Sequence, residues 1–83
     1  MALYFFNIYN TDVTVDEEGL DCADAAAARE RAAREARILA CDTIRNFGTL
    51  DLGHRIVILD AEKREVATVT FGDAIEIIQP KLD

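Results

Sequence analysis

The side chains best suited to chemistry in this 83-residue chain are two cysteines and one histidine, Cys22, Cys41 and His54. Zinc sites use three or four ligands, commonly paired at spacings such as Cys-x-x-Cys or His-x-x-x-His. These three residues show no such spacing. A cysteine–histidine pair also needs a third group to orient the imidazole, and no neighbour of His54 in the sequence is predicted to do so. We therefore predict no catalytic residue, no metal site and no cofactor, and we expect the protein not to be an enzyme.

The two cysteines do not predict a disulfide either. Most of the sequence between Cys22 and Cys41 has the composition of a helix. At a rise of ~1.5 Å per residue, such a helix separates the two residues by roughly 25 Å. A disulfide requires Cα atoms within about 7 Å. We expect two free thiols in a reducing compartment.

The N-terminus predicts a cytoplasmic location. Its first six residues carry no Lys or Arg, and the sequence turns polar at Asn7. A signal peptide has a basic start and a longer apolar stretch. Nor does any apolar run approach the ~18–20 residues that span a bilayer. We therefore expect no membrane partner.

A group of acidic residues before the helix is the other candidate for chemistry. Carboxylate oxygens bind hard cations, but the spacing in this group does not fit a calcium-binding loop. A solvated turn is the favoured interpretation, and a metal-binding or thiol-based enzyme is kept as an alternative. The chain contains no serine, which excludes a serine triad. The acidic residues are Asp12, Asp16, Glu17, Glu18 and Asp21.

The formal net charge of −7 argues against a nucleic-acid partner. Binding to duplex DNA depends on basic side chains that neutralise phosphates. The arginines of this chain are concentrated in one segment, where Glu30 and Arg34, and Arg31 and Glu35, have the i, i+4 spacing of ion pairs. The pattern predicts a solvated, salt-paired helix surface.

The sequence predicts a hairpin over residues 3–15. An acidic turn at 16–19, which contains Gly19, follows it. A long helix then begins at Asp24, which is a suitable N-cap, with Asp21 as the competing cap. Gly48 is placed to end the helix in a left-handed conformation. The residues predicted to face the core are Ala25, Ala28, Ala32, Ala36, Leu39, Thr43 and Phe47.

A second hairpin is predicted from residues 55–60 and 65–71, joined by a polar turn at 61–64. Residues 74–78 form a short apolar segment, either strand or turn. The chain is therefore expected to be one α+β domain, residues 1–83, with the order ββαββ. We predict an antiparallel-rich sheet with one long helix packed on one face.

The two faces of the first strand suggest a function. Side chains alternate along a strand, so Tyr4, Phe6 and Ile8 share the core face. The opposite face then carries Leu3, Phe5 and Tyr9, and one helix covers only one face of a sheet. These three residues are the candidate interaction surface. We predict a protein-interaction module, either a homodimer through the sheet or its edge, or a module bound to another protein.

The chain carries, in order, the motifs Tyr4-Phe5-Phe6, Asp16-Glu17-Glu18-Gly19, Asp24 with Ala27-Ala28-Arg29, Thr70-Phe71 and Ala74-Ile75-Glu76-Ile77. This ordered set resembles that of a family of short bacterial proteins of unknown function. Members of that family often have Leu after the capping Asp, where this chain has Ala25, and Gly in the last hairpin turn, where it has Lys63 or Arg64. The resemblance implies no activity and no binding residue. A looser likeness to HicB-type antitoxins implies, as an alternative, a regulator of a basic partner protein.

Overall fold

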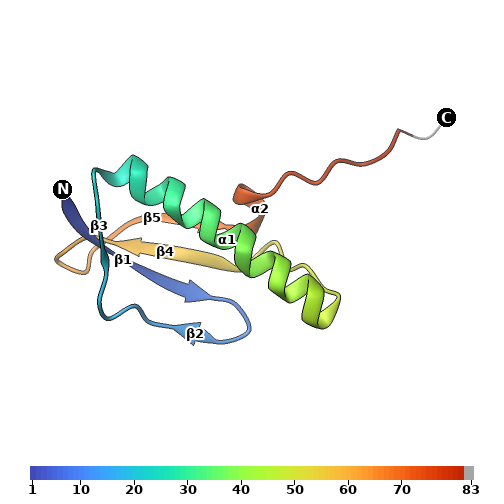
Figure 1. Ribbon diagram of the computed structural model, residues 1–83, viewed down its shortest axis with the longest axis horizontal. Coiled ribbons are helices and arrows are strands. Elements are labelled where there is room, and N and C mark those ends of the chain that lie inside the picture. The colour runs from blue at the N-terminus through green and yellow to red at the C-terminus, as the bar shows by residue number, and fades with distance from the viewer. Residues whose placement is uncertain (82–83) are drawn as a thin grey trace.

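The chain folds as an antiparallel sheet with one long helix across one face, as the computed structural model of residues 1–81 shows (Figure 1). The predicted α+β class is therefore confirmed. The elements are β1 (Ala2–Tyr9), β2 (Val13–Thr14), β3 (Leu20–Cys22), α1 (Ala25–Phe47), β4 (Arg55–Leu59), β5 (Glu65–Thr70) and α2 (Phe71–Ala74).

The sheet has the order β2-β1-β4-β5, and β3 also pairs with β1. β2 pairs with the last two residues of β1, and β3 pairs with its first three. In the centre, Phe6 lies opposite Ile58, and Ile56 lies opposite Val69. The prediction did not include β3, because a three-residue strand is too short to show an alternating pattern.

Both ends of α1 are set by the residues that the sequence indicated. Asp24 is the N-cap, and its carboxylate accepts a 2.8 Å hydrogen bond from the Ala27 N–H. Gly48 adopts a left-handed φ of 69°, and its N–H donates to the Ile44 carbonyl. The competing cap, Asp21, lies in β3 instead.

The helix packs on the sheet through small side chains. Its buried residues are Ala28, Ala32, Ala36 and Ala40. Because alanine has only a methyl group, the helix axis can lie close to the fully buried Ile56 and Ile58 of β4. The prediction that Phe47 faces the core was wrong, since its side chain is 74% exposed. A 23-residue helix is about 35 Å long, which exceeds the length of the strands, so its last turn extends past the sheet.

The β4–β5 turn contains Lys63 at a φ of 66°, in the left-handed region. This is the turn in which the resembled family often has glycine. The Asp60 carboxylate holds the turn by accepting hydrogen bonds from the backbone N–H groups of Glu62 and Arg64. These bonds hold the turn with Lys63 at a left-handed position, where glycine is the residue best suited.

The short helix α2 follows β5 directly and is held against α1. Thr70 and Asp73 form a capping box at its start, and the Arg37 guanidinium donates to the Ala74 carbonyl at 2.9 Å. Residues 75–81 contain no helix or strand and run away from the body, with Ile77 and Ile78 exposed (Figure 1). None of the described helices combines the length and apolar character needed to cross a bilayer.

Candidate functional site

The residues predicted to be able to do chemistry lie on different elements. Cys22 is buried in β3, Cys41 is exposed on α1, and His54 precedes β4. Both cysteines are free thiols. Within residues 1–81, no three His, Cys, Asp or Glu side chains come close enough together to hold a metal ion. Cys22, Cys41 and His54 therefore do not form a shared site.

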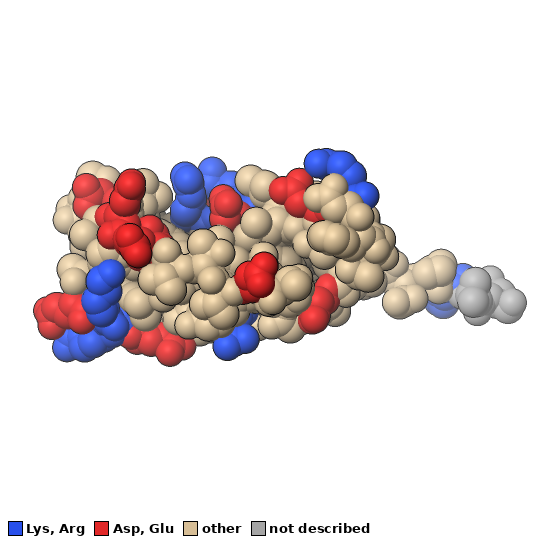
Figure 2. All heavy atoms as spheres, turned by 90° about the horizontal axis from the view of Figure 1, so that it is seen from below, with Lys and Arg blue, Asp and Glu red and all other residues tan. Residues whose placement is uncertain are grey.

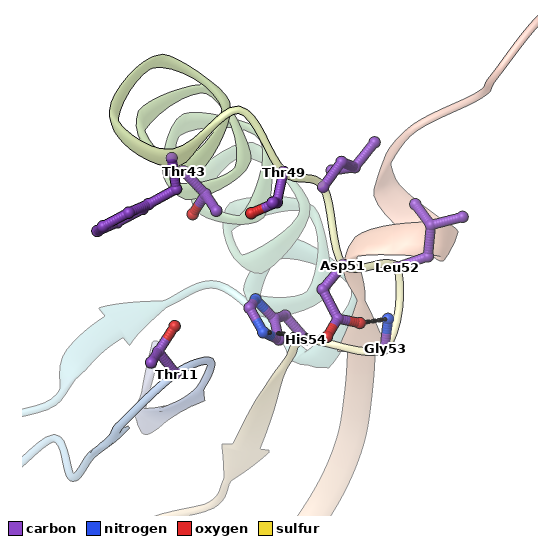
Figure 3. Close-up of a pocket in the computed structure, with 9 residues that line it drawn as sticks. Thr11, Thr43, Thr49, Asp51, Leu52, Gly53 and His54 are labelled. Carbon is purple, nitrogen blue, oxygen red and sulfur yellow. Dashed lines mark hydrogen bonds and ion pairs between the residues drawn. The ribbon is translucent and has the colours of Figure 1, made fainter.

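His54 lines a hollow of about 860 Å³ beneath the C-terminal end of α1 (Figure 3). Its Nε2 atom lies 3.4 Å from a carboxylate oxygen of Asp51, and its ring meets Phe71 edge-on at 5.4 Å between centroids. The other carboxylate oxygen of Asp51 accepts a hydrogen bond from the Gly53 N–H. The remaining lining residues are Thr11, Thr43, Phe47, Thr49, Leu50 and Leu52.

Three polar side chains of this hollow, those of Thr43, Asp51 and His54, make polar contacts within their own segment of the chain. The His54 Nδ1 atom is buried and has no hydrogen-bond partner among the described residues. The Thr43 hydroxyl donates to the Leu39 carbonyl and is held away from His54. The Asp51–His54 contact orients an imidazole without placing a nucleophile beside it. The pair fastens the loop before β4, and we assign it a structural role.

The acidic turn is a structural feature of the sheet edge, centred on Asp16. Its carboxylate accepts hydrogen bonds from the backbone N–H groups of Phe6, Glu18 and Gly19 at 3.0–3.2 Å. The Asn7 side chain accepts from the Asp16 N–H at 2.9 Å. Burial alone would raise the pKa of Asp16, but the three backbone donors, aided by the Lys63 charge, lower it below 3.8. Because the carboxylate accepts the Phe6 N–H, it occupies the backbone of β1 between the residues that pair with β2 and those that pair with β3.

The candidate interaction surface of the sheet is covered by cations of the same chain. Phe5 is outside the core cluster that packs under α1, yet it is only 6% exposed, and the Lys63 ammonium lies 3.4 Å from its ring centroid. The Arg55 guanidinium lies 4.5 Å above the Tyr9 ring. Tyr9 and Leu3 are half-buried. The apolar area expected on this face is therefore largely removed from water.

The charged surface around these elements is mixed. On the face shown in Figure 2, which views the molecule from below Figure 1, the basic residues lie among acidic ones. The pairings Glu30–Arg34 and Arg31–Glu35 are not among the ion pairs of the described residues. Those ion pairs join Arg45 to Asp42, and Arg64 to Asp60 and Glu62.

The sequence predicted association through the sheet or its edge, but it did not identify β5 as an open edge. Of the described strands, β5 pairs only with β4. The Phe71 N–H donates to the His54 carbonyl at 2.7 Å. Hydrogen-bonded pairs alternate along an antiparallel ladder, so Val69 and Ala67, two and four residues before Phe71, also direct their N–H and C=O groups toward β4. The N–H and C=O of Thr68 therefore point outward. No signal in the sequence could reveal this edge, because the order of strands depends on pairings between distant segments.

Comparison with known proteins gives one match. A family described as a domain of unknown function (DUF6894) matches residues 3–72, from β1 to the second residue of α2. This confirms the resemblance to a family of unknown function. No curated protein and no solved structure matches the chain at a level that indicates relationship.

Proposed function

Because the chain belongs to the DUF6894 family, whose description assigns no activity, we propose a function from the structure itself. The protein is a non-enzymatic interaction module that self-associates through its sheet, at the open edge of β5. The observation that carries the proposal is the unpaired outer side of β5. Such an edge presents a row of backbone donors and acceptors that another strand can pair with.

The two edges of the sheet differ in a way that favours β5. The opposite edge consists of the two-residue β2, the three-residue β3 and the turn closed by Asp16. That turn also exposes Glu17 and Glu18, and charged side chains discourage strand addition. β5, in contrast, is six residues long and has no charged residue after Glu65. Because only one edge is suited to pairing, association stops at a dimer.

The sheet face opposite α1 is less suited to a partner than the β5 edge, because cations of the same chain cover its aromatic rings. A partner that docked on Phe5 would have to displace the Lys63 ammonium, and one on Tyr9 would have to displace Arg55. Each cation–π contact contributes roughly 0.5–1 kcal/mol at an exposed site. The edge of β5 requires no such displacement. The proposal therefore places the interface on the edge of the sheet and not on Leu3, Phe5 and Tyr9.

A substitution that removes one outward donor tests the proposal. Thr68→Pro deletes the outward N–H, and the fold tolerates it because that group makes no bond to β4. Thr68→Val is the matched control, since it keeps the N–H and removes only the hydroxyl. Light scattering after size exclusion should give a dimer for the wild type and for Thr68→Val, and a monomer for Thr68→Pro, with unchanged circular dichroism in all three.

The wild type should be examined at ~100 µM, well above the micromolar dissociation constants of weak complexes. A monomeric wild type at that concentration would contradict the proposal. A folded Thr68→Pro variant that remains fully dimeric would also contradict it, because the interface would then lie away from β5.

A further inference from the structure

We infer that two copies pair β5 with β5 in antiparallel orientation, with Thr68 on the two-fold axis. This inference rests on the proposed function and specifies the partner, the orientation and the register of the interface. It commits to a second copy of this chain as the occupant of the edge.

The backbone of β5 supports this register. In an antiparallel ladder, directly opposed residues of a hydrogen-bonded pair exchange two N–H···O=C bonds. Thr68 directs both of its backbone groups outward, so two copies of Thr68 satisfy each other. Thr70 is the next outward residue, but its N–H is already taken by the Asp73 carboxylate at 3.0 Å. A register centred on Thr70 would leave that donor unable to pair, which favours the centre at Thr68.

An irregularity at the N-terminal end of β5 also favours a register centred on Thr68. The pairing of β5 with β4 is irregular between Ile58 and Leu59, where Val66 is an extra residue without a partner. A bulge of this kind bends the strand and disturbs its outer edge. The regular part of β5 therefore runs from Ala67 to Thr70, and Thr68 is its only residue with both backbone groups free to pair, within the part of the chain that the structure describes.

The side chain of Thr68 suits a position on the axis. A residue on a two-fold axis meets its own copy, so a charged side chain there would face a like charge. Threonine is neutral, and opposed threonines can hydrogen-bond with each other. Here the Thr68 hydroxyl donates to the Glu65 carboxylate at 2.8 Å on an exposed surface, and no buried contact has to break.

At the C-terminal end of this edge, the Asp73 side chain of α2 occupies the outward N–H of Thr70. α2 begins where β5 ends and packs against α1, so it turns toward the helix side of the sheet (Figure 1). Antiparallel pairing then joins the two sheets into one, with both copies of α1 on the same face. It also brings the turn with Lys63 and Arg64 in each copy to the end where Asp73 of the second copy lies.

Site-directed cross-linking tests the register. Single cysteines replace Val66, Thr68 or Thr70 in a Cys41→Ala chain, which keeps the buried Cys22 and removes the exposed thiol. In the inferred register, the two copies of residue 68 have Cα atoms about 5.5 Å apart. The two copies of residue 66 or 70 are offset by four residues, or roughly 13 Å along the strands. A short bismaleimide should therefore give its highest yield of covalent dimer with Thr68→Cys.

Each other outcome identifies what has failed. A maximum yield at Val66→Cys or Thr70→Cys would overturn the register and leave the β5 edge as the interface. A dimer in light scattering that cross-links at none of the three positions would overturn the inference but not self-association. A chain that is monomeric by light scattering would overturn the proposed function together with this inference.

Discussion

Lys63 combines an unfavourable backbone conformation with a favourable side-chain contact. A left-handed φ costs a non-glycine residue about 1–2 kcal/mol, and a cation–π contact contributes roughly 0.5–1 kcal/mol. The φ of 66° and the 3.4 Å contact with the Phe5 ring therefore nearly offset each other. The lysine covers an aromatic ring that a glycine at this turn would leave open to water.

This balance predicts different effects for two substitutions of Lys63. Lys63→Gly removes both the strain and the contact, so the free energy of unfolding should change by less than about 1 kcal/mol. Lys63→Ala removes the contact but keeps the strain, and should be less stable than Lys63→Gly by about 1 kcal/mol. Urea denaturation of the two variants and the wild type measures both differences. An alanine variant as stable as the glycine variant would show that this turn is not strained.

Asp16 should make a pH-dependent contribution to stability. Asp16→Ala leaves three backbone N–H groups without their acceptor, and the expected cost is about 1–3 kcal/mol at neutral pH. The pKa of Asp16 in the folded chain is lowered from 3.8, so its contribution is complete above pH 3.8. The contribution is lost as the pH falls below 3.8 through the folded pKa.

Thermal unfolding of wild type and Asp16→Ala at neutral pH and below pH 3.8 tests this sign. The comparison isolates Asp16, because Asp60 and Asp73, whose pKa values are also lowered by backbone N–H donors, are present in both chains. The difference in melting temperature should shrink in acid. A constant difference between the two pH values would show that the Asp16 carboxylate does not act through its charge.

Substitution of Phe5 should destabilise the fold more than substitution of Phe6, although the sequence pattern assigns Phe6 to the core face. The alternation of β1 assigns Phe6 to the core face, and Phe6 does pack against the core, but it stays half-buried and lines an open hollow. Phe5 is the more buried ring. Phe5→Ala should therefore cost close to the ~3–5 kcal/mol of a buried aromatic, and Phe6→Ala should cost less. Denaturant titrations that rank Phe6→Ala as the more damaging change would contradict this assignment.

At the scale of elements, the sequence predicted what is decided locally. Asp24 and Gly48 define the ends of α1 through bonds within one turn, and β4 and β5 pair as the predicted second hairpin. The buried alanine face was predicted up to Ala36, and the prediction failed at Phe47. The position of Phe47 depends on where the sheet ends, which no helical pattern contains.

Features that depend on distant segments were not predictable. β3 forms where Leu20–Cys22 pairs with Ala2–Tyr4, the part of β1 that precedes its pairing with β4. The cover on Phe5 comes from a turn 58 residues away in sequence, at Lys63. The interface proposed at β5 could not be predicted either. Preferring the β5 edge to the back face depends on the strand order and on the cation contacts of Phe5 and Tyr9.

At the scale of the whole molecule, the charge of −7 opposes self-association. Two copies repel each other, and the repulsion is screened as salt shortens the Debye length from ~30 Å at 0.01 M to ~8 Å at 0.15 M. The dimer should therefore bind more tightly at ~0.15 M than at ~0.01 M ionic strength. Sedimentation equilibrium at both ionic strengths measures the two dissociation constants. A dimer that weakens as salt is added would indicate an interface built on ion pairs instead of strand pairing.

Hydrogen exchange at the Thr68 amide measures whether the outer edge of β5 pairs with a second copy of the chain. In a single copy this N–H points to solvent, whereas the Val69 N–H is directed to β4 and serves as an internal reference. Residue-resolved exchange should be followed by NMR across a dilution series around ~100 µM, where a micromolar dimer is populated. The self-association account predicts that exchange at Thr68 slows as concentration rises, while Val69 stays protected throughout. An unprotected Thr68 amide at every concentration would contradict it.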